Sequence, residues 1–573
     1  MKHIITLKEL LGVLLIIFIL FSIYTFPLVL NMGDIIYGKK DVGVYYWNIY
    51  NFKLSLFQGE GIPFIKSEMI LHPHGANLFF HTNSLGLCIY ALFFDNHLLA
   101  MNTYALWHLL LGGVGMYMFT KHMTGDKAAS LFSAVLFCFC SYSTVRFLEH
   151  INLISTGLIP FYLLCFFKTF SFKEGTLLPR MISRKLLLWL IALFIANLLL
   201  DKVITMSLAL GTVAVFFGQA LLYVYHNTRK KYFWIGFIAL FVIGHLIIVV
   251  LKKGLQLDHG EGFYFSGDLI WFFIPVGKWL MSFELFDDLL QASHGDRLDS
   301  LVFLGFSTLI VVGVCLWHYF SKQPKDHMIR LFMVTAAIVL FIMHPEVRVL
   351  HNKLFYSLSA ILHFIPLLNN YRVPTRLVII LIPFILVMCG LIMQQMKASG
   401  IKKIIWPAAF VVLVIEFYPL GYQQYNKEPE PAYYEFLSRQ EGETALMIPF
   451  SISDGSRMFG DAGGTHQYYH QDRHHKKMIN GYISRLSDEI FEVSKQDSVL
   501  QHFTRLQKEE NAPAACDVKE AQKFMKYYSP DWIVVSPPYA NDKLINYIKQ
   551  SFKEYIVKIH EVEGAYLFAL KPM

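Results

Sequence analysis

Residues 11–30 of this chain read LGVLLIIFILFSIYTFPLVL, and residues 31–41 continue as NMGDIIYGKKD. The apolar run has the length that a helix needs to cross the hydrocarbon core of a bilayer. It follows Lys2 and Lys8, is longer than the core of a signal peptide, and lacks a small-residue cleavage site. We therefore expect an uncleaved first transmembrane helix.

The composition of the whole chain indicates that lipid is its main surrounding. Of the 573 residues, 55% are hydrophobic and only 16% are charged, whereas a soluble domain carries about 25% charged residues. Charged residues are sparse before residue 423 and dense after it. We expect a transmembrane domain at 1–422 and a soluble domain at 423–573.

Apolar stretches of nearly spanning length recur along the first part of the chain. They predict about eleven transmembrane helices, of which the others fall at 98–119, 128–146, 152–170, 185–200, 203–225, 232–251, 301–320, 329–344, 376–396 and 403–422. The shorter runs, at 152–170, 185–200 and 329–344, are the weakest of these predictions.

The charges between the spans predict their orientation. Alternate connections are short and basic, while the remaining long ones, at 31–97, 252–300 and 345–375, are mixed in charge. The positive-inside rule then places the N-terminus in the cytoplasm and the C-terminal domain outside it. We expect a multi-pass protein of the cytoplasmic (inner) membrane. The net charge of +8 follows from the basic connections, so we expect no nucleic-acid partner.

The tail has the alternating pattern of an α/β domain. Strand character appears at 445–449, 532–535, 555–562 and 565–570, and helical patterns appear at 431–439, 485–509, 518–528 and 541–551. The predicted fold is thus a polytopic α-helical membrane protein with a C-terminal soluble α/β domain.

Two carboxylates stand at the start of the first outer loop. Asp34 follows the first helix almost at once, and Asp41 opens an amphipathic stretch rich in aromatic residues. Such a stretch is typical of a helix in the membrane interface, and Asp41 could equally be its N-cap. At the outer membrane face, one carboxylate could deprotonate an acceptor hydroxyl while the other orients it or holds a divalent metal. No Asp-x-Asp motif is present, so a divalent metal stays open and no cofactor is certain.

This arrangement resembles the GT-C glycosyltransferases, which include protein O-mannosyltransferases, oligosaccharyltransferases and lipid A aminoarabinose transferases. Shared features are an Asp just beyond the first helix, a long outer loop, many further spans and a soluble C-terminal domain. Further motifs resemble bacterial membrane proteins of that build: HPHGANL (72–78), RFLEHINLI (146–154), FSGDLIWFFIP (265–275), NYRVPTR (370–376) and NGYISR (480–485). The resemblance implies transfer of a sugar from a polyprenyl-phosphate donor, with Asp34 or Asp41 as the catalytic base.

Charged residues near the predicted outer ends of the helices are candidates for binding the substrate. Ionisable groups close to the hydrocarbon tend to be paired or functional, although interfacial anchors explain them equally well. Arg372 is our first choice for the carrier phosphate, since a guanidinium matches phosphate oxygens bidentately. The other candidates are Arg376, Arg146, Glu149, His150 and Asp268.

A histidine-rich stretch in the tail could in principle bind zinc. His466, His470 and His474 are four residues apart and would share one face of a helix. The segment is polar all round, however, and no cysteine or acidic third ligand has the usual spacing. We favour a solvated or acceptor-facing segment and predict no metal site.

The sequence thus favours a membrane glycosyltransferase whose partners are a polyprenyl-phosphate sugar donor, membrane lipid, and a glycan, lipid or protein acceptor. One alternative is a lipid or polysaccharide transporter or flippase, which would need charges within the helices and broken helices in paired repeats. Another is a non-catalytic protein of envelope assembly, for which no single carboxylate would be indispensable. No Walker or dinucleotide fingerprint is present.

The predicted orientation can be tested by thiol labelling. An impermeant reagent should label Cys516 in intact cells, or in spheroplasts if an outer membrane intervenes, once mild denaturant loosens the tail. A cysteine introduced beside Arg229 should stay protected until the membrane is opened, because that basic connection is predicted to be cytoplasmic. The reverse labelling pattern would invert the predicted topology.

Overall fold

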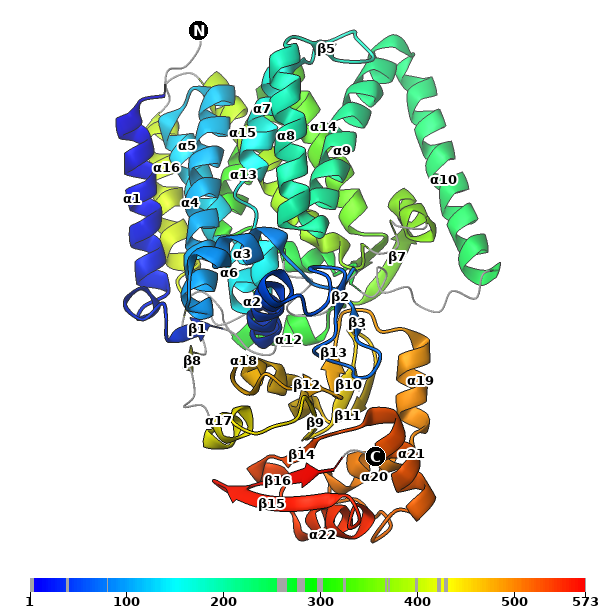
Figure 1. The fold of residues 1–573 in the computed structure, drawn as a ribbon. Helices are drawn as coiled ribbons and strands as arrows, with labels where there is room; N and C mark the ends of the chain where they lie inside the picture. The colour runs from blue at the N-terminus through cyan, green and yellow to red at the C-terminus, as the bar shows by residue number, and fades with distance from the viewer. Residues whose placement is uncertain are drawn as a thin grey trace. The chain divides into compact units, whose positions relative to one another are not determined.

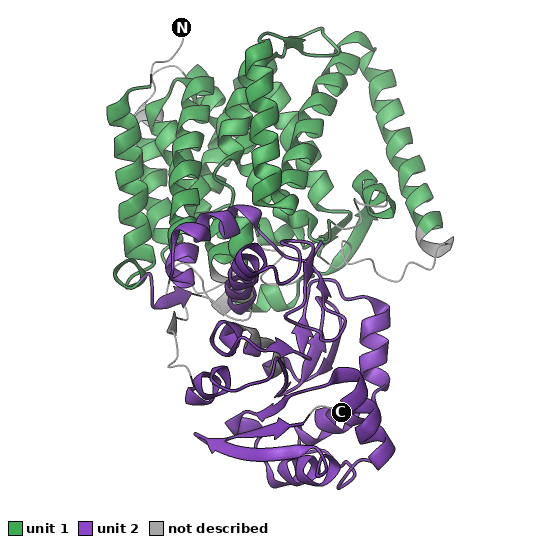
Figure 2. Cartoon of the chain, viewed as in Figure 1, with its two compact units in different colours: residues 1–31, 103–423 green, residues 32–102, 424–573 purple. Residues whose placement is uncertain are grey.

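The chain folds into two compact units (Figure 2). Unit 1 holds residues 1–31 and 103–423, and unit 2 holds residues 32–102 and 424–573. The computed structural model describes residues 5–571 except 38–40, 80, 255–264, 276–283, 296–301, 323–325, 366–367, 369–370, 397–399, 420–423 and 427–430. The predicted first outer loop, which the sequence places in the transmembrane domain, therefore belongs to the same unit as the tail.

Unit 1 is a bundle of long helices (Figure 1). They are α1 (Leu7–Tyr24), α4 (His97–Thr124, which begins in unit 2), α5 (Lys127–Phe139), α6 (Ser141–Glu149), α7 (Ile159–Thr169), α8 (Arg184–Leu200), α9 (Lys202–Asn227), α10 (Lys230–Gly254), α13 (Phe306–Lys322), α14 (His327–Met343), α15 (Val378–Gln395) and α16 (Gly400–Glu416). Each predicted span overlaps one of these helices or a consecutive pair, which confirms the prediction of a polytopic α-helical membrane protein.

Seven helical segments of the described chain are long and apolar enough to cross a membrane, and α13, α14 and α16 contribute shorter apolar helices. The number of crossings stays a prediction. Burial differs sharply along the bundle: the most apolar part of α15 is 89% buried, whereas that of α10 is only 11% buried. Because lipid is as apolar as the side chains of α10, such exposure carries no penalty in a bilayer.

Short elements connect the long helices of unit 1. They are α12 (Glu284–Gln291), the 3-10 helices η1 (Leu28–Leu30), η3 (Ile151–Ile154), η4 (Leu269–Phe272), η5 (Leu358–Phe364) and η7 (Pro374–Leu377), and the hairpins of β4 (Phe170–Ser171) with β5 (Arg180–Met181) and β6 (Glu346–Val349) with β7 (Asn352–Tyr356). Aspartates begin three of the long helices: Asp126, Asp201 and Asp326 each accept two backbone N–H groups of the first turn. These caps satisfy donors that the helix itself cannot pair.

The tail in unit 2 is built on a five-stranded sheet of order β12–β9–β14–β16–β15. The strands β12 (Lys477–Met478), β9 (Thr444–Ile448) and β14 (Trp532–Val535) are parallel, and β16 (Ala565–Leu570) and β15 (Ile556–Val562) complete the sheet antiparallel. Its helices are α17 (Ala432–Ser438), α18 (Gln471–His474), α19 (Asp488–Gln496), α20 (Ser498–Leu506), α21 (Val518–Tyr528) and α22 (Asp542–Ser551). The predicted α/β fold of the tail is confirmed.

Smaller elements complete the tail. A second sheet has the order β11 (Met458–Gly460), β10 (Ser451–Ser453), β13 (Gly481–Tyr482), and the 3-10 helices are η8 (Ala462–His470) and η9 (Pro537–Tyr539). The three strands are too short to show a period of two in the sequence, and none of these elements was predicted.

The first outer loop supplies part of the core of unit 2. Its elements are β1 (Ile35–Tyr37), α2 (Asp41–Gln58), the hairpin of β2 (Lys66–Ser67) with β3 (Ala76–Asn77), α3 (Leu85–Tyr90) and η2 (Ala91–Phe93). Strand β1 pairs antiparallel with β8 (Gln424–Asn426) at the start of the tail. Loop residues share one hydrophobic core with the sheet and helices of the tail, namely Trp47, Tyr50, Leu54, Met69, Ile70, Leu71, Ala76 and Leu78.

Residues 69–72 of the loop cover one edge of the five-stranded sheet. The Met478 amide donates to the Met69 carbonyl at 2.8 Å, and the His72 amide donates to the Met478 carbonyl at 3.0 Å. The Leu71 amide donates to the Asn480 carbonyl at 3.1 Å. An open strand edge exposes unpaired backbone groups and invites aggregation, so the loop satisfies the edge that β12 would otherwise present.

Gly481 allows the loop to pack against this edge because it has no side chain. A Cβ atom at this position would lie 2.3 Å from Leu71 Cδ2. We expect Gly481→Ala to cost about 1–3 kcal/mol through overpacking, to lower the melting temperature of the full chain in detergent, and to speed hydrogen exchange at 66–78.

The matched control is Gly313→Ala, because nothing lies within 4 Å of the Cβ that this change adds in α13. Alanine is the better helix former, so the control should melt at the wild-type temperature or above it. Equal melting temperatures and exchange rates for the two variants would contradict the close packing of Leu71 on Gly481.

Candidate functional site

The two proposed bases both lie in unit 2, at the start of the first outer loop. Asp34 directly precedes β1 and is exposed to solvent. Asp41 is the first residue of α2, and its side chain lies outside the described part of the chain.

Helix α2 is attached to the tail by aromatic side chains with polar ends. Tyr46 donates its hydroxyl to Asp472 Oδ2 at 2.7 Å, and the Tyr50 hydroxyl lies 3.0 Å from His475 Nδ1. Residues 46 and 50 are four apart and so share one face of the helix. Burial, together with the negative charge of Asp472, raises the pKa of both tyrosines, so their hydroxyls stay protonated. The aromatic stretch expected at the membrane interface is instead buried in the protein.

A second polar network joins the loop to the NGYISR motif. The Ser484 amide donates to His81 Nδ1 at 3.1 Å, and His81 Nε2 lies 3.1 Å from Asn48 Oδ1. Because Nδ1 already accepts a backbone N–H, the imidazole proton is on Nε2 and points at Asn48. Ser484 Oγ is 3.2 Å from the same Nδ1 and also accepts the Thr82 amide. All of these side chains except Thr82 are buried, so the cluster has the geometry of a structural network rather than of an activated nucleophile.

Unit 1 contains a buried group of charged and polar side chains around Arg146. This arginine is only 2% exposed on α6, and its Nη1 lies 3.2 Å from His150 Nδ1. Its guanidinium is 5.5 Å from the centre of the Tyr142 ring, within reach of a cation–π interaction. The side chain of Glu149 lies outside the described residues.

Asp201 supplies the negative charge of this group. Its Oδ1 caps α9 by accepting the Val203 and Ile204 amides at 2.8 and 2.9 Å. Its Oδ2 accepts a hydrogen bond from Asn152 Nδ2 at 2.7 Å. Arg376 interacts electrostatically with Asp201, and it acts together with Arg146 on Tyr142. Two of the predicted substrate-binding arginines are therefore brought to one buried group.

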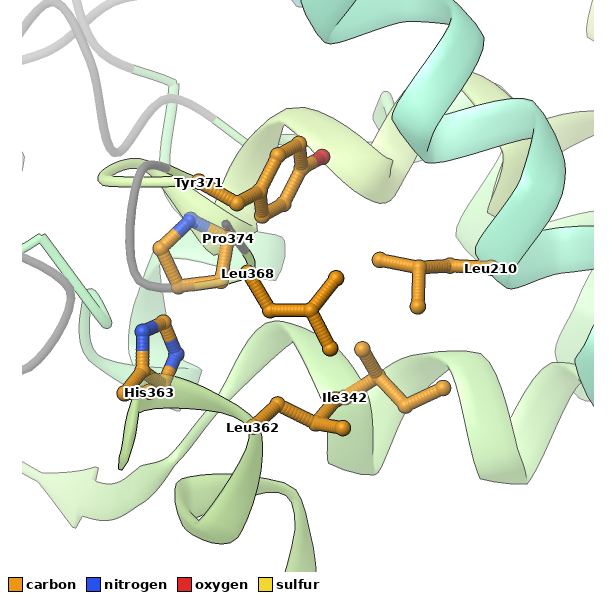
Figure 3. A pocket seen from close by; sticks show the side chains of 7 residues that line it. All are labelled: Leu210, Ile342, Leu362, His363, Leu368, Tyr371 and Pro374. Carbon is orange, nitrogen blue, oxygen red and sulfur yellow. The ribbon is translucent and has the colours of Figure 1, made fainter. Parts of the chain in front are cut away.

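An apolar pocket is lined in part by Tyr371 and Pro374 of the NYRVPTR motif. The Tyr371 hydroxyl lies 2.7 Å from Ser207 Oγ on α9, and Arg372, the next residue, is half-buried. The pocket is small and is lined by Leu210, Ile342, Leu362, His363, Leu368, Tyr371 and Pro374. Figure 3 shows the aliphatic side chains pointing toward one another, with the three ring side chains along the remaining wall.

Asp268 stands apart from this group. It is fully buried, and both carboxylate oxygens accept backbone N–H groups, from Ile270 at 3.1 Å and from His351 at 2.7 Å. Asp268 therefore joins two loop segments of unit 1, and these hydrogen bonds indicate a structural role.

Several members of the buried group were not predicted from the sequence. They are Tyr142, Asn152, Asp201, Ser207 and Tyr371. Tyr371 was within reach because it belongs to the NYRVPTR motif, and Asp201 because it separates two apolar runs. Ser207 and Tyr142 gave no signal, because hydroxyl side chains are common inside membrane helices.

The histidine-rich stretch of the tail is a packing element. His470 and His474 both stack on Tyr434, with ring centres 4.5 and 5.6 Å apart. His474 is buried and its Nδ1 accepts the Lys476 amide at 3.0 Å. The expectation of a solvated segment is therefore wrong for His474, whereas His470 is half-buried and the side chain of His466 lies outside the described residues. The described residues contain no group of three or more His, Cys, Asp or Glu side chains placed to hold a metal ion.

Comparison with known proteins finds likeness only among solved structures. No protein-family model matches the chain, and no curated protein matches it. The fold is similar to the cryo-EM structure of the arabinofuranosyltransferase AftD from Mycobacteria, with a TM-score of 0.53 at 12% identity over 99% of this chain and 42% of that one. The chain thus spans less than half the length of AftD.

Two structures from Archaeoglobus fulgidus are less similar. They are an oligosaccharyltransferase in the apo form (TM-score 0.43, 11% identity) and the oligosaccharyltransferase AglB in complex with an inhibitory peptide and a dolichol-phosphate (0.40, 10%). Each match covers 99% of this chain and 74% of the other. The likeness to AftD confirms, at the level of the fold, the predicted resemblance to GT-C membrane proteins.

The buried position of His474 predicts that unit 2 loses stability in acid. Burial, and then the charges of the neighbouring His470, His475 and Lys476, lower the pKa of His474 to about 3, whereas an unfolded histidine has a pKa of about 6.5. Between these values only the unfolded chain binds the proton. Stability is therefore complete above about pH 6.5 and falls by up to about 1.4 kcal/mol per unit as the pH decreases toward 3.

His474→Asn should flatten this dependence, because an amide oxygen can still accept the Lys476 amide but does not titrate. The measurement is the melting temperature of the full chain in detergent between about pH 4.5 and pH 7.5, the window in which the two pKa values differ. Parallel curves for the variant and the wild type would show that His474 does not stay neutral in the folded protein.

Proposed function

We propose that this chain is a membrane glycosyltransferase that moves a sugar from a polyprenyl-phosphate donor to an acceptor outside the cytoplasm. The observation that carries the proposal is the group of buried Arg146 and half-buried Arg376 in unit 1, together with the apolar pocket at Tyr371, in a fold similar to that of an arabinofuranosyltransferase. A cationic group next to an apolar cavity matches a ligand that has a phosphate on a hydrocarbon chain.

The proposed phosphate ligands are Arg372, Arg376 and Arg146. A guanidinium presents a fork of N–H donors that fits two phosphate oxygens at once and stays charged when partly buried. Arg146 lies over the Tyr142 ring, Arg376 interacts electrostatically with the hydroxyl of the same tyrosine, and Arg372 follows the pocket residue Tyr371 in the chain. His150 and Glu149 are proposed to assist from the end of α6, whereas Asp268, whose two oxygens both accept backbone N–H groups, is proposed to support its loop and not to bind the phosphate.

The pocket is the proposed seat of the first part of the lipid chain. Four of its seven lining residues are leucine or isoleucine (Figure 3). Burying apolar surface there would contribute about 25 cal/mol per Å². We propose that these apolar side chains contact the first part of the hydrocarbon chain while the phosphate binds the arginines.

The proposed reaction is a single inverting displacement. The acceptor hydroxyl oxygen attacks the anomeric carbon of the sugar, and the bond from that carbon to the phosphate oxygen breaks. Polyprenyl phosphate leaves with the electron pair, and the carboxylate of Asp34 or Asp41 takes the hydroxyl proton. We also propose that both carboxylates and the tail face the outside of the cytoplasmic membrane, as the loop charges predict.

Replacing the proposed base tests this function. Asp34→Asn and Asp41→Asn keep the shape of the side chain and remove its proton acceptor. General-base catalysis is typically worth about 10²–10⁴-fold, so one of the two variants should lose turnover by that factor with an unchanged melting temperature. The assay follows radiolabelled hexose from undecaprenyl phosphate into washed envelope membranes, and Asp287→Asn, an exposed acid on α12, is the control.

Two results would overturn the assignment. Full transfer by both variants would show that neither carboxylate is the base. Early melting with preserved specific activity would mark the residue as a helix cap, whose loss costs about 0.5–2 kcal/mol.

Arg372→Lys should mainly raise KM for the donor, because a point charge replaces a bidentate fork.

A further inference from the structure

Gln471 links three separate segments of unit 2. Its Oε1 accepts a hydrogen bond from Trp47 Nε1 on α2 at 2.5 Å. Its Nε2 donates to the carbonyls of Met69, in the loop, at 2.7 Å, and of Lys476, in the tail, at 2.9 Å. The side chain is fully buried, so no solvent can replace these partners.

The direction of these bonds fixes the amide in one orientation. Both protons of the NH₂ group point at carbonyl oxygens, and the amide oxygen faces an indole N–H, which can only donate. Rotating the amide by half a turn would place its NH₂ group against the indole N–H of Trp47 and its oxygen against the carbonyl oxygens of Met69 and Lys476. Because buried polar groups without partners cost about 1–3 kcal/mol each, Gln471 holds Trp47 in one place relative to the tail.

The residues around Gln471 tighten the same attachment. The Tyr46 ring stacks on Tyr469 with centres 4.4 Å apart, while its hydroxyl binds Asp472. One turn further along α2, the Tyr50 hydroxyl meets His475. The segment 469–475 therefore contacts α2 at Tyr46, Trp47 and Tyr50 and fixes the position of this helix, which begins at Asp41.

The backbone on either side of Asp34 is held as well. Asn96 Nδ2 donates to the Gly33 carbonyl at 2.9 Å, and Asn102 Nδ2 donates to the Ile35 carbonyl at 2.8 Å. The following residues, Ile35–Tyr37, pair with strand β8 of the tail. Asp34 thus sits between two fixed peptide groups.

We propose that Gln471 is a positioning residue of the transferase, and that the tail fixes the location of the catalytic base through α2 and β1. This inference rests on the proposed function. A general base works only within hydrogen-bond reach of the proton it takes, and a displacement of about 1 Å can cost 10²-fold.

Gln507 offers a matched control within the same domain. It is also buried, and its amide bonds both backbone groups of Phe450, at 2.7 and 3.0 Å. These bonds lie wholly within the tail. Gln471→Leu and Gln507→Leu each remove a buried amide and leave buried backbone groups without partners, so both should lower the melting temperature.

The two variants should differ in catalysis. We expect Gln471→Leu to lower kcat for transfer from undecaprenyl-phosphate hexose by about 10- to 100-fold without changing KM for that donor. Hydrogen exchange at 41–58 should become faster. Gln507→Leu should keep the wild-type kcat per folded molecule and the wild-type exchange at 41–58.

If Gln471→Leu fails to fold, Trp47→Phe tests the same bond from its other end, since it keeps a ring and removes only the N–H donor. Faster exchange at 41–58 with a wild-type kcat would overturn the proposal, and so would equal losses of kcat in the Gln471 and Gln507 variants. The failure of the proposed function would look different: Asp34→Asn and Asp41→Asn would both stay fully active, whatever Gln471→Leu does to exchange in α2.

Discussion

The fold of unit 2 depends on the need to satisfy buried polar groups across a very long stretch of chain. The bond from Trp47 to Gln471 joins residues 424 positions apart. The same glutamine binds the Met69 carbonyl, and residues 69–72 pair with the edge of the sheet. Taking the loop away would leave an open strand edge and a set of buried donors and acceptors without partners. The tail and the first outer loop are therefore one folding unit.

Buried charged and polar groups have different kinds of partners in the two units. In unit 1, Arg146 is buried in an apolar bundle, where an unpaired charge would be costly, and it contacts His150 and the face of Tyr142 in a group whose negative charge comes from Asp201. In unit 2, buried amides, hydroxyls and a neutral histidine are satisfied by hydrogen bonds, and the buried carboxylate of Asp454 is paired with Arg457. The arginine group of unit 1 is where we propose that the donor phosphate binds.

Local patterns predicted most of the fold. The spans were readable because apolar length alone identifies a membrane helix, and strands such as Trp532–Val535 and Ala565–Leu570 were predicted to the residue. The pairing of β1 with β8 and of residues 69–72 with β12 could not be predicted, since segments of two to four residues have no readable period and no pattern names a distant partner. Trp47 and Tyr50 illustrate the same limit: an aromatic face fits a membrane interface and a protein core equally well.

The most direct test of the account is a cryo-EM map of the full chain with undecaprenyl phosphate bound. The account predicts phosphate density against the guanidinium groups of Arg372, Arg376 or Arg146. It also predicts that the first isoprene units occupy the pocket beside Tyr371 and His363. Phosphate density away from all three arginines, with that pocket empty of lipid, would contradict the proposal that this chain draws its sugar from a lipid-phosphate carrier.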